Sequence, residues 1–449
     1  MDHPYGWLSI VPPLATVAIA LATRRVLLSL LLGLFAGALI LRGGALGQAI
    51  YDLCEVHLWA SLIEPTKLRV LGFTLMMGAM IGLLNAGGGM QGLVRLIAPL
   101  THDARSGQLT TWLLGLIVFF DDYTNTLLLG GAMRPTFDRL RLSREKLAYI
   151  VDSTAATVAC LAPMSVWVAF ELECIRDGLQ NARGADTSNL TPLSLFLACL
   201  PYRFYVILAL VLVVLVAVLK RDFGPMVRAE QRARAEGNAS LSEGDEHAQP
   251  RVTHWSNALA PILVTLASVM VLIYATGRTA LADTNATPTL WQIVGAADSV
   301  KALFYGALIG LLFSAGLLRA RQVLSAKQVR NATFFGVRTV IPALAILWLA
   351  GTMSRMTSSK DVSGAVESTP YEFKEHRLYT GQYLTALLPT QDSESAGTVS
   401  ALLPVSVFLI ACLVSFSTGT SFGTMGILMP VVTPVAVAAA TGANGAVDA

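Results

Sequence analysis

LTTWLLGLIVFFDDYTNTLLLGGAM, from Leu109 to Met133, is an apolar run that carries two adjacent aspartates, Asp121 and Asp122. A second apolar run, LAYIVDSTAATVACLAPMSVWVAF from Leu147 to Phe170, carries Asp152. A carboxylate at the centre of a bilayer costs on the order of 3 kcal/mol, so such acids usually face a bundle interior, pair with one another, or carry ions and protons. The three aspartates are therefore the leading candidates for function.

The composition is typical of a polytopic membrane protein. Hydrophobic residues make up 54% of the chain, charged residues only 14%, and the mean hydropathy is +0.61, whereas a soluble domain carries about 25% charged residues. The net charge of +3 is spread over loops, which argues against nucleic-acid binding. The apolar runs contain no Ser-His-Asp set, phosphate loop or histidine cluster, and the five cysteines are scattered. We therefore expect neither an enzyme nor a cofactor, and no resident metal.

Runs of about 20 apolar residues are long enough to cross about 30 Å of hydrocarbon as helices. The candidates are residues 7–23, 26–41, 68–85, 109–133, 147–170, 194–219, 256–276, 299–318, 333–352, 399–416 and 425–440. A polar segment, residues 220–255, separates an N-terminal membrane half (1–219) from a C-terminal half (256–449). We predict an all-α polytopic membrane protein with about 10–12 transmembrane or re-entrant helices, in two repeat-related halves with broken helices at the midplane. The polar segment is interpreted as a cytosolic linker.

The distribution of basic residues predicts a break in the first aspartate run. If each run crosses once from an outside N-terminus, only one of the four basic connections, Arg24-Arg25, lies inside, against the positive-inside rule. One extra crossing before Arg134 places all four inside and leaves the acidic residues 171–186 outside. A hairpin that turns at DDYTN (121–125) supplies this crossing, and a crossing or re-entrant piece near residues 91–100 is the alternative.

Oxygen-bearing side chains gather within one turn of the segment FFDDYTNTLL. In a helix, Asn125 and Thr126 lie one turn after Asp121 and Asp122 respectively. Hard monovalent cations prefer oxygen ligands, and two close carboxylates tend to retain a proton because like charges repel. A proton and a cation would then compete for one site. The alternative is that one aspartate caps a half-helix or pairs with a buried arginine.

Two further polar islands interrupt the apolar runs. Asp152 is followed by Ser153 and Thr154, which either supply oxygens or form an ordinary N-cap. In SFSTGTSFGTMGILMP (residues 415–430), glycines loosen the helix between hydroxyl side chains, which are Ser417, Thr418, Thr420 and Ser421. Close packing of helices through small residues explains this run equally well.

Three arginines lie within or beside apolar runs and are candidate counter-charges or anion ligands: Arg134, Arg203 and Arg338. The alternative for Arg203 and Arg338 is that the side chain reaches toward the membrane interface, where its charge is solvated.

The chain resembles the NhaC-type Na+/H+ antiporter family of the ion-transporter superfamily. FFDDYTNTLLLGGAMRP, SREKLAYIVDSTAATVA and SFSTGTSFGTMGILMP are similar to the signature segments of that family, including the spacing from Asp-Asp to Arg-Pro to Asp-Ser-Thr. The resemblance extends from about residue 68 to residue 434, with 355–377 similar to an insertion. It implies that Asp121, Asp122, Asn125 and Asp152 line the ion path. It also implies that the TGTS run around Thr420 belongs to the opposing repeat.

This resemblance implies a multi-pass antiporter of the inner (cytoplasmic) membrane that exchanges Na+ for H+ by alternating access. Its expected partners are the two ions and the lipid bilayer, with a homodimer as one oligomeric state to test. Relatives include exchangers of malate and lactate coupled to Na+ and H+, so an organic-anion exchanger with Arg134 or Arg338 as anion ligand is the alternative. Family members continue into Gly-Asp-His and Ser-Pro-x-Ser-Asp motifs, so we expect a chain ending in GANGAVDA to be a fragment or a truncated homologue.

Overall fold

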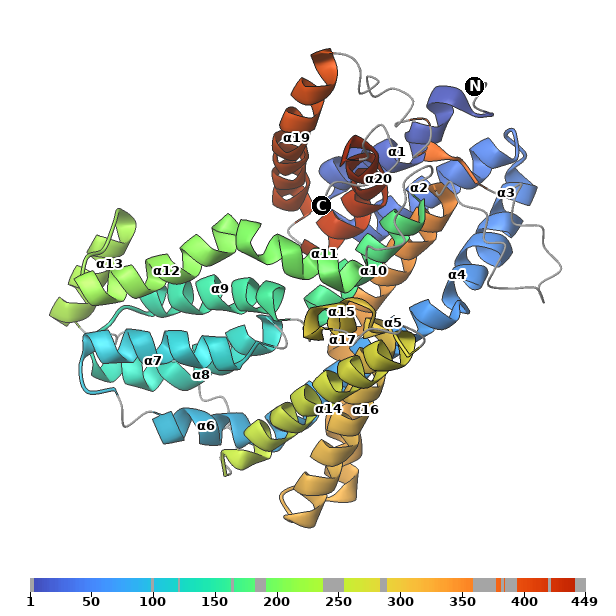
Figure 1. The fold of residues 1–449 in the computed structure, drawn as a ribbon. Coiled ribbons are helices and arrows are strands. Elements are labelled where there is room, and N and C mark those ends of the chain that lie inside the picture. The colour runs from blue at the N-terminus through green and yellow to red at the C-terminus, as the bar shows by residue number, and fades with distance from the viewer. Residues whose placement is uncertain are drawn as a thin grey trace. The chain divides into compact units, whose positions relative to one another are not determined.

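All described secondary structure is helical (Figure 1). The computed structural model describes residues 4–97, 101–119, 122–162, 165–181, 191–236, 254–282, 289–357, 377–380, 383, 394–418 and 421–440. The early elements are η1 (Gly6–Ile10), α1 (Val11–Thr23), α2 (Val26–Leu41), α3 (Leu46–Asp52), η2 (Leu53–Trp59), α4 (Ala60–Leu62), α5 (Pro65–Ala86), α6 (Gly89–Ile97), α7 (Ala104–Ile117), α8 (Asp122–Arg139), α9 (Arg144–Leu161) and α10 (Val166–Asn181). The later elements are α11 (Pro192–Cys199), η4 (Leu200–Tyr202), α12 (Phe204–Leu219), α13 (Pro225–Glu236), α14 (Ser256–Ala280), α15 (Leu290–Gly295), α16 (Ser299–Ala320), α17 (Ala326–Thr357), α19 (Glu394–Thr418) and α20 (Ser421–Ala440).

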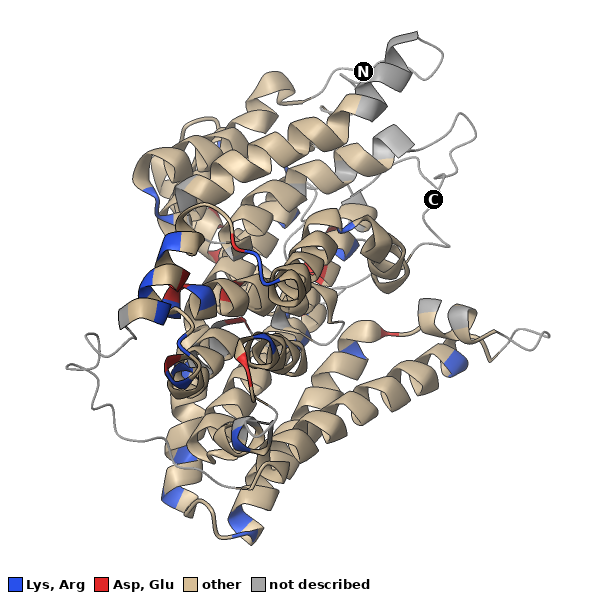
Figure 2. Ribbon diagram, turned by 90° about the vertical axis from the view of Figure 1, so that its left-hand side faces the viewer, with Lys and Arg blue, Asp and Glu red and all other residues tan. Residues whose placement is uncertain are grey.

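Several of these helices match the predicted spans in length and hydropathy. Within the described residues, five helices are long and apolar enough to cross a membrane, or six if the pair bent by 48° at Arg203 counts as one span. Figure 2 shows that most of the helical ribbon carries neither acidic nor basic residues. The prediction of an all-α polytopic membrane protein is confirmed. The number of crossings and the repeat relationship of the halves stay predictions.

Two of the three polar islands lie at helix breaks, whereas the third, Asp152 with Ser153 and Thr154, lies within α9. The first aspartate run is divided between α7 and α8, and the second between α9 and α10. The hydroxyl-rich run is divided between α19, which ends at Thr418, and α20, which begins at Ser421. The breaks predicted in the first aspartate run and in the hydroxyl-rich run therefore occur. In the first of them, α8 begins at Asp122 of the DDYTN segment.

The described chain forms two compact units, each assembled from separate stretches of sequence. Unit 1 comprises Met1–Leu71, Phe170–Leu195 and Ile341–Ala449, and unit 2 comprises Gly72–Ala169 and Phe196–Val340. The chain passes from one unit to the other within α5, α10, α11 and α17. The sequence-based division at residues 220–255 stays a prediction about repeats, and it follows different boundaries from these units.

The core of unit 1 is built from the first and last helices of the chain. Leu30 and Leu34 of α2 are fully buried against Met353 of α17 and Val414 of α19. Between membrane helices such packing stabilises through close van der Waals contact. Contacts between residues far apart in sequence therefore hold this unit together.

Unit 2 uses glycines to bring α5 and α17 into backbone contact. A Cβ atom added to Gly82 would lie 2.2 Å from the carbonyl oxygen of Ala332, and one added to Gly336 would lie 2.1 Å from that of Gly78. Small residues allow such close approach between membrane helices. We expect Gly336→Ala to lower stability by about 2 kcal/mol through overpacking.

Thermal unfolding in detergent tests this prediction. Gly316→Ala on α16 is the matched control, because a Cβ there meets nothing within 4 Å and alanine favours a helix over glycine by about 1 kcal/mol. Equal melting temperatures for Gly336→Ala and the wild type would contradict the packing argument.

The first part of the predicted linker is a docked helix. Glu230 on α13 accepts hydrogen bonds from the N–H of Ser143 (2.9 Å) and from its hydroxyl (2.6 Å), and its side chain is buried. Ser143 is the N-cap of α9, where its hydroxyl accepts a bond from the N–H of Lys146. The linker therefore stabilises the start of the helix that carries Asp152.

We expect Glu230→Ala to destabilise the protein by about 1.5 kcal/mol, because it leaves a buried N–H of Ser143 unpaired. The melting temperature in detergent is the measurement. Arg232→Ala, on the same helix, removes a solvent-exposed ion pair with Glu145 and should change stability by less than about 1 kcal/mol. A larger effect for Arg232→Ala than for Glu230→Ala would contradict the assignment.

Candidate functional site: the α7–α8 hairpin

The two helices of the first aspartate run form an antiparallel hairpin in unit 2. Arg139 at the end of α8 donates to the hydroxyl of Thr101, just before α7 (2.9 Å), and Gly107 in α7 lies against Leu140. The hydrogen bond from the Ser106 side chain, with that from its N–H, lowers the pKa of Asp103, the N-cap of α7. Figure 1 shows α7, α8 and α9 side by side, which agrees with their mutual contacts. The structure thus favours the hairpin of the two predicted alternatives.

Asn125 closes this hairpin from the first turn of α8. Its side-chain N–H2 group donates to the carbonyl oxygens of Gly115 and Val118, each at 3.0 Å, and the residue is fully buried. The last carbonyls of a helix lack partners within the helix, so a side-chain donor satisfies them. The Oδ1 atom of Asn125 is buried and has no hydrogen-bond partner among the described residues. The N–H2 group of this side chain therefore stabilises the hairpin, while its Oδ1 atom is an unpaired acceptor.

Asp122 begins α8 and is half-buried. The indole N–H of Trp167 donates to its Oδ1 at 3.1 Å. Trp167 lies in the first turn of α10, directly after the α9–α10 break, so this bond joins two broken helices. The positive end of the α8 dipole lies at this carboxyl group, whereas the carbonyl end of α7 favours a cation. The break thus combines a carboxylate with electrostatics suited to a cation.

The second aspartate run lies beside the hairpin on α9. The hydroxyl of Thr154 donates to the carbonyl of Ile150 (2.9 Å), and its side chain fills the space where a Cβ of Gly115 would lie. Thr154 is thus a buried packing residue between α9 and α7. Asp152 and Ser153 lie in mid-helix, with Asp152 exposed, and Ser143 caps the helix. The N-cap alternative for Asp152 is therefore wrong.

Two further predicted residues of unit 2 on α8, Thr126 and Arg134, are exposed. Thr126 is exposed on α8, and Asp121 lies outside the described residues. Arg134 is exposed twelve positions after Asp122 on α8, which corresponds to about 18 Å along a helix. Their separation along α8 therefore keeps Arg134 away from Asp122.

Arg203 lies at the break between η4 and α12, and Arg338 lies within α17, both in unit 2. Arg203 donates to the carbonyl of Cys160 in the last turn of α9 (3.2 Å) and lies over the ring of Phe196 at 4.9 Å. A cation at a helix C-terminus is stabilised by the dipole, which gives Arg203 a structural contact. Arg338 is exposed on α17. Their predicted role as counter-charges stays a prediction.

The hydroxyl-rich run belongs to unit 1. Ser417 and Thr418 end α19, Ser421 begins α20 half-buried, and Thr420 lies outside the described residues. Gly426 in α20 packs on Ala350 of α17. The packing interpretation thus describes the later part of this run, and its role as opposing-repeat oxygens stays a prediction.

Sequence reasoning missed Trp167 and a buried ion cluster in unit 1. The expectation that the acidic residues 171–186 lie outside the membrane stays a prediction, and the structure adds that α10 continues to Asn181 and buries Glu173. The spacing of Glu173 and Asp177, one helical turn apart in a helix that starts with apolar residues, was the available signal. Their basic partner, Lys67, lies more than 100 residues away in sequence, which no local pattern reveals.

Comparison with known proteins identifies the family. The sequence pattern of the Na+/H+ antiporter family matches residues 158–362 and 382–443, more than half of the chain. The chain belongs to the Na+/H+ antiporter family. The resemblance noted in the sequence is thereby confirmed, and the chain is a multi-pass secondary transporter rather than an enzyme.

An uncharacterized protein of Haemophilus influenzae is 30% identical over 444 residues, which are 98% of this chain and 78% of that protein. The crystal structure of the YdaH transporter of Alcanivorax borkumensis matches with a TM-score of 0.50 at 13% identity, over 82% of this chain and 70% of that one. MtrF of Neisseria gonorrhoeae, an antimetabolite efflux pump, gives a TM-score of 0.44 at 14% identity, over 87% and 71%. The YdaH match shows a shared transporter fold.

Proposed function

We propose that this antiporter-family protein exchanges Na+ for H+ across the inner membrane by alternating access, at the break of the α7–α8 hairpin. The observation that carries the proposal is Asp122, half-buried at this break and bonded to Trp167. The unpaired Oδ1 of Asn125 lies within the same turn of α8. Family membership supports exchange of these two ions.

In this mechanism the carboxylate of Asp122 alternates between a proton and Na+. Asp121, the adjacent acid in the sequence, is its proposed partner, because two close carboxylates hold one proton more tightly than either alone. The Oδ1 of Asn125 and the hydroxyls of Thr126 and Ser153 are proposed neutral ligands. Asp152 is proposed as a third acid on the ion path, and the hydroxyls of α19 and α20 as ligands from the opposing repeat.

The test uses the purified chain in liposomes with an entrapped pH dye and an imposed proton gradient. Addition of Na+, Li+ or K+ outside should change the dye signal, with Na+ most effective, and choline should not. A response to malate that requires Na+, without a response to cations alone, would replace the proposal by organic-anion exchange. No response to any of these solutes would reject Na+/H+ exchange by this chain.

A further inference from the structure

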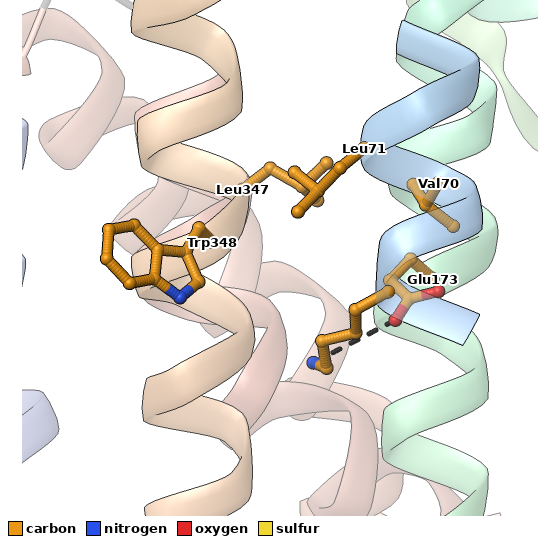
Figure 3. Close-up of a pocket in the computed structure, with 6 residues that line it drawn as sticks. Val70, Leu71, Glu173, Leu347 and Trp348 are labelled. Atoms are coloured by element: carbon orange, nitrogen blue, oxygen red, sulfur yellow. Dashed lines mark ion pairs between the residues drawn. The ribbon is translucent and has the colours of Figure 1, made fainter. Parts of the chain in front are cut away.

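Unit 1 contains a buried cluster of two cations and two carboxylates, far from the hairpin in sequence. Lys67, in the first turn of α5, places its ammonium 3.0 Å from Asp177 Oδ2 and 3.8 Å from Glu173 Oε1, both on α10. Arg176 on α10 pairs with Glu173 and lies 3.7 Å from Asp177. Figure 3 shows Glu173 of this cluster, with its ion pair drawn as a dashed line. The four charges sum to zero.

The cluster is enclosed. The side chains of Lys67 and Glu173 are only 6% and 4% exposed. Taking such charges out of water is costly, so their attraction must be strong and the remaining polar atoms should be bonded. Yet Glu173 Oε2 is buried without a hydrogen-bond partner among the described residues. This atom is an acceptor that the cluster itself leaves unused.

Small cavities adjoin the residue that carries this acceptor. Glu173 lines two small cavities in unit 1, each with room for about one water molecule. One of them is also lined by Asp177, Gly351 and Ser354. A Cβ on Gly351 would lie 2.4 Å from the ammonium of Lys67, so glycine makes room for this cation. The volume suits water or a dehydrated monovalent cation and is too small for a dicarboxylate.

We propose that Glu173 and Asp177 form a second cation site, at which a monovalent cation competes with the ammonium of Lys67. An ammonium and a Na+ ion use the same carboxylate oxygens, and the hydroxyl of Ser354 adds another ligand at the cavity wall. Arg176 stays charged because a guanidinium does not lose its proton in proteins. When the cation enters, Lys67 therefore releases one proton to water, and the cluster remains neutral. The nearest other acid, Glu64, is held by Arg355 at 3.3 Å.

The competing interpretation is a structural ion network that does not bind Na+. The stability of such a network would be the same in Na+ and choline salts. The two differ in what happens when Lys67 is removed. A network that loses its lysine keeps two buried carboxylates against one arginine and is destabilised in every salt. A cation site that loses its lysine becomes free to bind Na+, and ligand binding to the folded state raises its stability.

The experiment compares thermal unfolding of the full chain in detergent, in NaCl and in choline chloride at equal ionic strength. Lys67→Met should melt roughly 5 °C higher in NaCl than in choline chloride, and the wild type should show a smaller difference. The double variant Lys67→Met with Glu173→Gln removes the second carboxylate and should lose this Na+ effect. Lys146→Met is the matched control, because Lys146 is equally buried but pairs with the single carboxylate of Asp222 in unit 2.

Equal Na+ effects in Lys67→Met, the double variant and the wild type would overturn the proposal. Failure to recover Lys67→Met in NaCl, when the double variant is recovered, would also overturn it, since Na+ would then not replace the ammonium. The outcome is independent of the hairpin proposal. Asp122→Asn added to Lys67→Met should leave the Na+ effect unchanged, even though exchange at the hairpin is lost.

Discussion

Asp122→Asn is expected to reduce Na+-driven proton movement in proteoliposomes to the level of protein-free vesicles. Asparagine keeps the size of the side chain and an oxygen acceptor for the indole of Trp167, but it can neither bind a proton nor neutralise a cation. An exchanger needs a group that does both at one site. The fold should be retained. Among the ion pairs of the described residues, the buried lysines pair with other carboxylates than Asp122, so the substitution leaves none of them without its partner.

The measurement is the initial rate of the dye response after addition of Na+, with elution volume and melting temperature confirming the fold. Asp138→Asn is the matched control on the same helix, since Asp138 is partly exposed and pairs with Arg144 at 3.1 Å. It should retain wild-type exchange. Wild-type rates in Asp122→Asn, or equal losses in both variants, would reject Asp122 as the exchanging carboxylate.

Asn125→Ala is expected to produce the largest loss of stability among the substitutions at the hairpin. It removes two hydrogen bonds to the carbonyls of Gly115 and Val118 and leaves both acceptors buried. Each such buried group costs about 1–3 kcal/mol, and the space left by the amide adds to this, so the total is about 4 kcal/mol. The break between α7 and α8 would lose the contact that fixes its geometry.

Thermal unfolding in detergent measures this loss, and exchange should fall with it. Asn331→Ala on α17 is the control, because Asn331 is exposed and surface substitutions usually change stability by less than about 0.5 kcal/mol. A melting temperature for Asn125→Ala within the range of this control would show that the hairpin does not depend on the amide.

The sequence by itself determined the class of fold and the places of two helix breaks, those between α7 and α8 and between α19 and α20. Apolar length specifies membrane helices because every backbone polar group must find a partner within the helix. Acids and glycines inside such runs mark the interruptions, as between α7 and α8 and between α19 and α20. The motifs around these breaks also identified the family, which the comparison confirmed. These features depend only on residues close together in the sequence, so they can be predicted from the sequence alone.

The role of each side chain at the breaks was decided only by the tertiary structure. Asn125 was predicted as an ion ligand from its spacing to Asp121, yet its amide N–H2 bonds the end of α7. Thr154 was predicted as a ligand, which stays a prediction, and the structure adds that it packs against Gly115. Which face of a helix is buried depends on the neighbouring helices, and a helix that is apolar on all sides does not encode that face.

Long-range pairing was likewise beyond the sequence. The cluster of Lys67 with Glu173 and Asp177 joins α5 to α10 within unit 1. Within this acidic stretch Glu173 is buried on α10, and the lysine that pairs with it lies more than 100 residues away in sequence. The sequence fixes which charges exist, whereas only the folded chain determines which of them meet, because the energy of a buried charge depends on the distance to its partner.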